Sequence, residues 1–337
     1  MPPVYQFAKI FSKYLPINLF VDRNNTLSAK FHTKVKYAFF YALCIALIDS
    51  FQVVNAQNRK TYYSLNKAME NPESVINLLI SHNPDVNLHN LQKFINLESL
   101  RLEHCYIKVL PKSIEKLTSL EILDLRNNQL KKLPNEITNL KRLRVLLVSN
   151  NSLKRLPDGI EKLNKLIELH LDNNKIKHLP QDIIYLKHLK WLSLKNNKIK
   201  ALPEGFGNYT KLISLNLKHN SIKTLPNSIG KSKNLERLNI SQNKLRKLPK
   251  EISNLTKLKI LNLNENNLKS IPTNIRNLEN LTECYLGNNL LTTLPKSITQ
   301  LISLLRLTLS GNELVKSDID NLKNALPKCW VIFKNKK

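Results

Sequence analysis

The feature that most constrains this chain is a proline that returns every 23 residues. Nine of its 15 prolines stand on one unbroken grid, each directly after a Leu or Ile. They are Pro111, Pro134, Pro157, Pro180, Pro203, Pro226, Pro249, Pro272 and Pro295. A fixed period between 20 and 50 residues is typical of solenoids and other repeat arrays, in which one small unit is stacked many times. The chain is therefore predicted to be a repeat protein.

Other slots of the unit are almost as regular as the proline. Leucine stands 14 residues before each grid proline, and the slots 11 and 9 before it depart from Leu only at Val148, Ile240 and Cys284. The slot six before it is asparagine in nine copies and Cys105 in the first. The asparagines are Asn128, Asn151, Asn174, Asn197, Asn220, Asn243, Asn266, Asn289 and Asn312. The unit reads LxxLxLxxNxLxxLPxxIxxL.

Each slot has a physical interpretation. The LxL pair alternates as a short β-strand does, so both leucines face inward and their neighbours face solvent. The chain must turn after each strand, which buries backbone N–H and C=O groups that an Asn carboxamide satisfies with its own donors and acceptor. The proline disfavours a regular helix on the return path. We expect an α/β fold: a curved solenoid with a parallel β-sheet on its concave face.

The solenoid is predicted to hold eleven rungs between two caps. A degenerate unit with Val75, Leu78, Ile80 and Asn83 precedes the grid, and a last unit follows it. Repeat arrays need atypical ends because a regular end repeat would expose the core. We expect an N-terminal cap over 57–74 with a helix at 64–70, repeats over 75–317, and a C-terminal cap over 318–337. In that cap, 318–326 is predicted as a helix and 329–333 as a closing strand.

With these motifs the chain resembles the 23-residue leucine-rich repeat proteins, found among secreted bacterial proteins and intracellular scaffolds of Ras-type signalling. The resemblance covers residues 64–333. The lead-in from Tyr63 to Val75, and Leu326-Pro327-Lys328-Cys329 before an apolar strand, are similar to the flanks of the bacterial members. The resemblance implies a binding surface without fixing the ligand.

The N-terminal segment has the pattern of an export signal. Lys34 and Lys36 precede an apolar run from Tyr37 to Ile48, and cleavage is predicted after Ala56. We interpret 35–56 as the signal peptide and 1–34 as an extension that is not translated if synthesis starts at a non-AUG codon for Val35. The run is too short to be a stable transmembrane span. The alternatives left open are a retained anchor and a cytoplasmic protein.

The chain is strongly basic, with 53 Lys and Arg against 25 Asp and Glu, a net charge of +28. Concave strand positions are nearly balanced in charge, so the excess lies elsewhere. Three residues before the grid proline, eight consecutive rungs carry a cation: Lys108, Lys131, Lys154, Lys177, Lys200, Lys223, Arg246 and Lys269. This basic edge favours binding of a polyanion such as an anionic glycan or lipopolysaccharide. The alternative is that lysine is a soluble filler at this slot. Nucleic acid is disfavoured because no aromatic residues interleave with the lysines to stack bases.

A second candidate surface is the concave face. Ile122, Val145, Leu147, His170 and Trp191 are predicted to point outward from neighbouring strands, and Tyr285 with Ile260 would form a weaker patch. Exposed apolar clusters rimmed by charge mark interfaces, and Trp is a favoured anchor. The alternative is incidental surface hydrophobicity.

No motif points to catalysis. The chain has no nucleophile elbow, P-loop, GxGxxG or HExxH, and the repeats leave no stretch for an enzyme domain. We expect no cofactor and no metal, since His82 and His104 on neighbouring rungs lack a third ligand. The sequence therefore predicts a non-catalytic, exported, basic protein that binds a macromolecule through its concave face. An intracellular signalling scaffold and polyanion binding through the basic edge are the alternatives.

Overall fold

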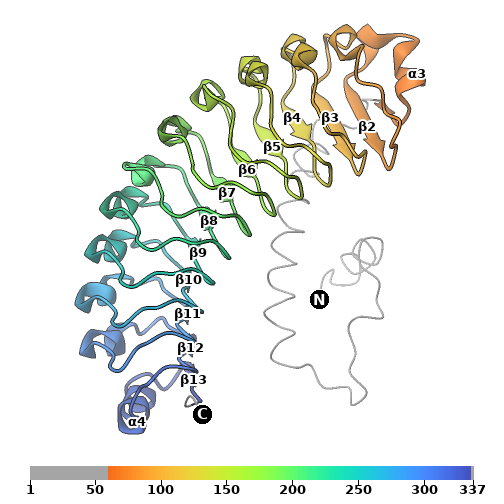
Figure 1. Cartoon of the computed structure of the whole chain (residues 1–337). Coiled ribbons are helices and arrows are strands. Elements are labelled where there is room, and N and C mark those ends of the chain that lie inside the picture. The colour runs from red at the N-terminus through yellow and green to blue at the C-terminus, as the bar shows by residue number, and fades with distance from the viewer. Residues whose placement is uncertain (1–59, 335–337) are drawn as a thin grey trace, which may run out of the picture. The chain divides into compact units, whose positions relative to one another are not determined.

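The computed structural model describes residues 60–334, which form a solenoid built on one 13-stranded parallel sheet (Figure 1). The strands follow one another in chain order, so each pairs only with its sequence neighbours. They are β1 (Thr61–Tyr62), β2 (Asn77–Ser81), β3 (Ser99–Glu103), β4 (Ile122–Asp124), β5 (Val145–Leu147), β6 (Glu168–His170), β7 (Trp191–Ser193), β8 (Ser214–Asn216), β9 (Arg237–Asn239), β10 (Ile260–Asn262), β11 (Glu283–Tyr285), β12 (Arg306–Thr308) and β13 (Trp330–Ile332). The predicted α/β leucine-rich repeat solenoid is confirmed, and β2 to β12 are its eleven rungs.

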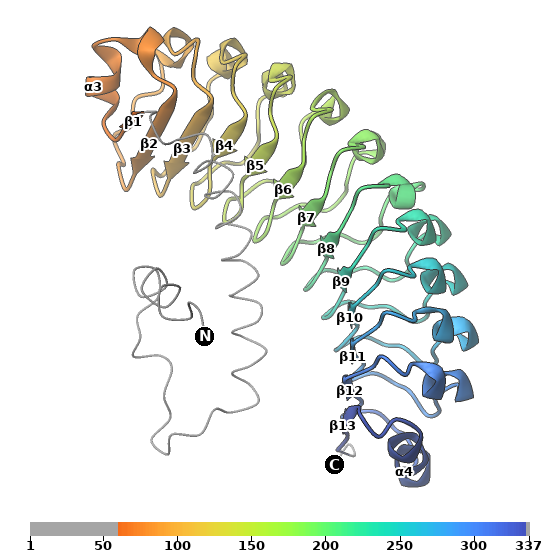
Figure 2. The same cartoon turned by 180° about the vertical axis from the view of Figure 1, so that it is seen from behind.

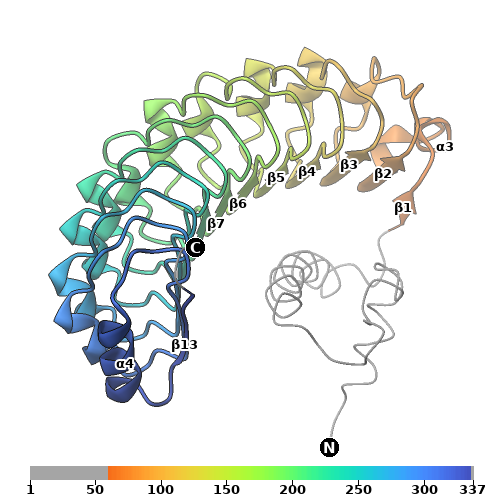
Figure 3. The ribbon, with the colours of Figure 1, turned by 60° about the horizontal axis from the view of Figure 1, so that its bottom comes forward.

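The register of the sheet is the 23-residue period itself. Ile122 pairs with Val145 and Leu123 with Leu146, so each slot of the unit forms a straight column across the sheet. The LxL leucines are buried with almost no exposed surface and form one continuous core along the solenoid. Figures 2 and 3 show the strands along the inner side of the arc and the return turns along its outer side.

The outer side consists of short 3-10 turns. They are η2 (Pro72–Ser74), η3 (Leu91–Lys93), η4 (Lys112–Lys116), η5 (Asn135–Asn139), η6 (Ile160–Lys162), η7 (Gln181–Tyr185), η8 (Phe206–Asn208), η9 (Asn227–Lys231), η10 (Lys250–Asn254), η11 (Thr273–Asn277) and η12 (Lys296–Gln300). Grid prolines such as Pro134 hold extended backbone immediately before these turns. Their isoleucines, such as Ile137, are buried. The predicted absence of a regular helix on this side is correct.

One outer turn departs from the pattern with bulkier side chains. Phe206 and Tyr209 fill slots that hold Ile and Leu on most other rungs and meet edge to face, with ring centroids 5.2 Å apart. The Tyr209 hydroxyl donates to the Ile183 carbonyl at 2.8 Å. Gly207 lies so close to the next turn that a Cβ there would stand 1.5 Å from the Ser228 carbonyl oxygen. Glycine at this position lets neighbouring rungs approach around the larger rings.

Irregular units cover both ends of the described solenoid. At the start, β1 and α3 (Leu65–Met69) pack against β2. At the other end, α4 (Lys316–Ala325) starts two residues before the predicted helix, and β13 pairs with β12. The predicted extension 1–34 and signal segment 35–56 lie outside the described residues. Between residues 60 and 334, no helix has the length and apolar character needed to cross a membrane.

Candidate functional site

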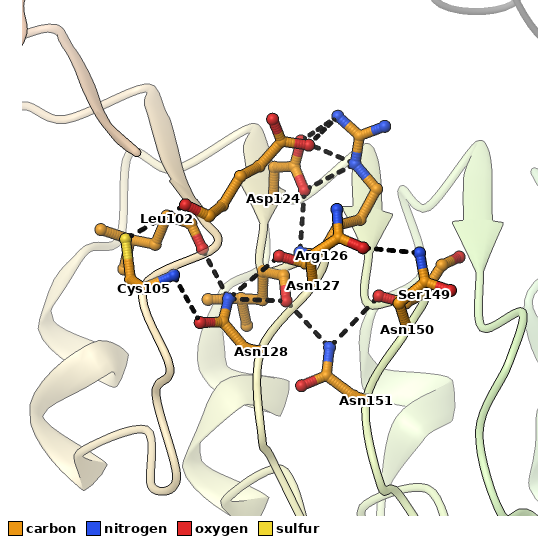
Figure 4. Close-up of polar contacts among 11 residues, drawn as sticks. Leu102, Cys105, Asp124, Arg126, Asn127, Asn128, Ser149, Asn150 and Asn151 are labelled. Atoms are coloured by element: carbon orange, nitrogen blue, oxygen red, sulfur yellow. Dashed lines mark hydrogen bonds and ion pairs between the residues drawn. The ribbon is translucent and has the colours of Figure 1, made fainter. Parts of the chain in front are cut away.

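The ladder asparagines lie just beyond the strands, where they organise the edge of the concave face. The Asn128 carboxamide donates to the carbonyls of Leu102 at 2.6 Å and Leu125 at 3.0 Å, and its oxygen accepts from the N–H of Cys105 and Ile107 (Figure 4). All nine predicted ladder asparagines are buried. Their amides bond both to their own turn and to the preceding rung, so the column joins successive turns with a continuous hydrogen-bond network.

Cys105 occupies the first ladder slot with a different set of bonds. Its thiol contacts the carbonyls of Ile80 at 3.5 Å and Glu103 at 3.2 Å. A ladder oxygen here would accept two N–H groups of the rung before: that of Asp85, which is already bonded to the Asn83 side chain at 3.0 Å, and that of Asn83, which bonds to the Cys105 sulfur. Burial raises the pKa of the Cys105 thiol, so it stays protonated as a donor. The cysteine therefore both donates to two carbonyls and accepts from one N–H, on a rung where the second N–H already has a partner.

A second asparagine column, absent from the sequence prediction, runs beside the ladder. Asn127, Asn150, Asn173 and Asn196 precede ladder residues and all hold a positive φ between 54° and 58°. Their amides bond from rung to rung, Asn150 to Asn127 at 2.7 Å and Asn173 to Asn150 at 2.6 Å. The repeated Asn-Asn pair could have revealed the column, because Asn tolerates this left-handed backbone better than most residues.

The structure places the predicted apolar residues on the concave strands in two groups. Ile122, Val145 and Leu147 lie together on β4 and β5. Trp191 lies on β7, and β6 separates it from the first group. Ile122, Val145 and Trp191 are partly exposed, whereas Leu147 is 5% exposed. The Lys190 ammonium lies 5.9 Å from the centroid of the Trp191 ring.

Strand β6 brings a buried polar network between the two apolar groups. Glu168 lies between Val145 and Trp191 and contacts the ring of His170, with Nε2 2.9 Å from its Oε1. Asp172 accepts from the Ser193 hydroxyl at 2.5 Å and from the Lys195 N–H at 2.8 Å. Burial raises the pKa of Asp172, against the opposing effect of these hydrogen bonds. The sequence signal was Glu-x-His-x-Asp, since alternate residues of a strand share one face.

Charges on the first rungs of the concave face are paired. The Arg126 guanidinium contacts Glu103 at 2.5 Å and Asp124 at 2.6 Å. Burial and the neighbouring Asp124 carboxylate raise the pKa of Glu103, although Arg126 opposes them. On these first rungs, the oppositely charged residues predicted for this face are thus in direct ion pairs.

The weaker predicted patch lies farther along the sheet. Tyr285 is 6% exposed and its hydroxyl bonds to Glu283, so it presents little free aromatic surface. Ile260 on β10 pairs with Glu283 on β11. The apolar groups on β4, β5 and β7 therefore form the larger accessible surface.

The predicted basic edge lies where each strand end descends to the outer turn. On each rung, five residues lie between the ladder residue and the grid proline. We call the surface formed by these segments, with its exposed cations, the basic flank. Over eight rungs, from residue 106 to 271, the segments hold 14 Lys and Arg and no Asp or Glu. The eight predicted cations, Lys108 to Lys269, are all exposed, and none makes an ion pair with another described residue.

His82 and His104 meet as their spacing suggested. Their rings stack with centroids 4.6 Å apart and planes 9° apart. In residues 60–334, no three His, Cys, Asp or Glu side chains converge as a metal site would require. Cys284 is buried in a leucine slot, and burial raises its pKa to about 12. These residues therefore offer no reactive thiol or metal cluster on either surface.

Comparisons with known proteins agree with this architecture. Models of a leucine-rich repeat region match residues 74–174 and 168–262, and a leucine-rich repeat model matches 257–278. A comparison with curated proteins gave no significant match.

Several solved structures are similar to the chain. The plant peptide hormone receptor RGFR1, solved in complex with RGF2, is 27% identical over 82% of this chain and 46% of the receptor chain, with a TM-score of 0.68. The Listeria monocytogenes internalin InlF is 22% identical over 79% of this chain and 89% of its own, with a TM-score of 0.51. The Leptospira interrogans protein LIC12759 is 28% identical over 81% of this chain and all of its own, with a TM-score of 0.49. With family models matching more than half of its length, the chain belongs to the leucine-rich repeat family.

Proposed function

We propose that this protein is exported and binds another protein through its concave face, without catalysing a reaction. The proposal rests on the partly exposed apolar side chains of Ile122, Val145 and Trp191, which lie on either side of the Glu168–His170 pair on the concave face. A partly exposed Trp beside apolar neighbours is the composition of an interface centre. The plant receptor with a similar fold was solved with a bound partner, which supports a macromolecular ligand here.

The buried polar network favours a preorganised surface. Asp172 accepts hydrogen bonds from Ser193 and Lys195, and the Glu168 carboxylate lies 2.9 Å from His170 Nε2, with its Oε1 buried and without a hydrogen bond to another described residue, so a ligand would meet apolar groups beside polar groups that the fold already holds in place. Binding would then bury Ile122, Val145 and Trp191 without breaking ion pairs. The apolar groups would then supply most of the binding energy, and the charged residues around them would orient the ligand.

Combining Trp191→Ala with Val145→Asp tests the concave surface. Immobilised full-length protein should retain a partner from extracellular or envelope fractions, and the double variant should lose it. Tyr185→Ala is the matched control, because Tyr185 is an aromatic residue that is 52% exposed on the outer turn η7. Equal retention by all three proteins would refute the assignment of the surface.

Export is tested separately by the N-terminal peptide of the native protein. A mature N-terminus at Gln57, found by mass spectrometry in the extracellular or envelope fraction, is the expected result. An intact N-terminus in the cytosol would refute export and leave an intracellular scaffold that uses the same face.

A further inference from the structure

We propose that the basic flank is a second binding surface, for a linear anionic polysaccharide whose sulfate or carboxylate groups contact successive rungs. This proposal does not depend on the concave-face function, because the two surfaces share no residue. The flank lies between the strand ends and the outer turns, whereas the apolar groups lie on the strands.

The first support is the absence of compensating charge on the flank. On the concave face, Arg126 is neutralised by Glu103 and Asp124. On the flank, Arg155 contacts Asp158 at 3.8 Å, with both side chains 71% exposed. The eight predicted cations, from Lys108 to Lys269, make no ion pair with another described residue. Like charges along one side of the molecule create a field that attracts a polyanion. Binding is further favoured because it releases the counterions condensed on the polyanion.

The second support is the regular spacing. Neighbouring strands lie about 4.8 Å apart, so the eight cations of the column recur at each rung along the arc. Lysine carries its ammonium on a flexible stem and can follow anionic groups that are not matched in register. A polymer with charge at every repeat can contact several rungs at once.

The residues around the flank distinguish this ligand from other polyanions. Proteins that hold single-stranded nucleic acid place aromatic side chains among the basic ones, but the flank segments from 129 to 271 contain no Phe, Tyr or Trp. Binding to an anionic lipid surface is strengthened by apolar side chains that enter the interface. The exposed large apolar residues of the flank segments, Tyr106 and Val109, both stand on its first rung. The flank segments from 129 to 271 therefore have no exposed large apolar side chains that could enter a lipid surface.

The test compares two charge-reversed variants of the full chain with the same net charge. Lys131, Lys154, Lys177 and Lys200 become Glu in the flank variant. Lys162, Lys165, Lys187 and Lys211, which are exposed on outer turns and on segments returning to the strands, become Glu in the control. Fluorescent heparin serves as the probe, and its affinity is measured by anisotropy over a series of salt concentrations. Circular dichroism confirms that each variant is folded.

The flank variant should lose at least about tenfold in heparin affinity and show a shallower salt dependence, because fewer counterions are released. The control should lose much less. Equal losses in both variants would show that only net charge matters and would overturn the proposal. Flank-dependent binding of poly-glutamate, an oligonucleotide or phosphatidylglycerol vesicles at least as tight as that of heparin would also overturn it. If the reversed flank variant does not fold, the four Lys→Gln substitutions replace it, with the same expected direction.

Discussion

Two neighbouring asparagine columns of this solenoid use the same residue type for different reasons. In the ladder column, Asn197 is buried and its carboxamide bonds backbone groups of two rungs. In the adjacent column, Asn196 is partly exposed and holds a φ of 54°, and its carboxamide donates to the side chain of Asn173 on the preceding rung. The ladder column is asparagine on nine consecutive rungs, whereas the second column also contains His219, Gln242 and Glu265 at positive φ. The ladder position requires the hydrogen-bonding groups of an Asn side chain. The adjacent position mainly requires a residue that tolerates a positive φ.

The largest expected effect breaks the ladder column. Asn197→Ala removes the donors to the Leu171 and Leu194 carbonyls and the acceptor for the Ile176 N–H. Each buried group left without a partner costs about 1–3 kcal/mol, so we expect the free energy of unfolding to fall by about 3 kcal/mol. Urea unfolding followed by circular dichroism measures the change. Asn196→Ala is the neighbouring control, and an equal loss there would contradict the distinction between the columns.

The second prediction isolates backbone conformation in the outer column. Asn196→Val should lower the free energy of unfolding by about 1–2 kcal/mol, because a branched Cβ clashes with the backbone at positive φ. Asn196→Gly should stay closer to the wild type, since glycine adopts this conformation freely. Both variants lose the 2.7 Å bond to Asn173. Equal unfolding midpoints for the two would show that this bond, rather than the backbone, sets the choice of asparagine.

The contrast also explains what the sequence could predict. The LxL leucines and the ladder asparagines recur because buried slots accept few residues, and their period predicted the sheet, its register and eleven rungs. The residues of the second column share a positive φ but differ in side-chain type, so their repeat is hard to recognise in the sequence. Strand β1 (Thr61–Tyr62) was missed because it lies before the first unit and has no repeat slot to mark it.

The candidate surfaces were predicted less completely than the fold. Alternation along a strand placed Val145 and Trp191 on the concave face, but it could not reveal that Glu168 and His170 are buried between them. Their burial depends on the side chains of the neighbouring strands. In contrast, the basic flank was visible in the sequence because exposed residues between two fixed slots remain exposed on every rung.

A smaller effect is expected where the ladder begins. Consensus reasoning predicts that Cys105→Asn would stabilise the chain, because asparagine fills this slot on the next nine rungs. The structure predicts a change of less than about 1 kcal/mol, since the groups that an asparagine would bond already have partners: the Asp85 N–H bonds to the Asn83 side chain, and the Cys105 thiol already bonds to the Asn83 N–H and to two carbonyls. Urea unfolding of the variant and of the Asn83→Ala, Cys105→Asn pair checks this. A gain in Cys105→Asn alone as large as the loss in Asn197→Ala would contradict it.

The smallest expected effect on stability concerns Asp172, an acid in a slot that holds the amide Asn264 on another rung. Asp172 accepts the Lys195 N–H at 2.8 Å, and Asn264, in the same slot, accepts the Gly287 N–H at 2.7 Å. Asp172→Asn should therefore preserve the acceptor while removing a buried charge.

The expected pH dependence follows from the raised pKa of Asp172. Because the folded state holds this proton to a higher pH than the unfolded chain, ionisation makes stability fall as pH rises from the ordinary Asp value through the raised one. The asparagine variant lacks that fall, so it should be more stable than the wild type at neutral pH, and its advantage should shrink as the solution is acidified. The difference in urea midpoint between the two proteins across this range measures the effect, and the raised pKa of Glu103 cancels because both proteins share it. A variant less stable than the wild type at neutral pH would mean that His170 and Lys195 stabilise the carboxylate more than burial disfavours it.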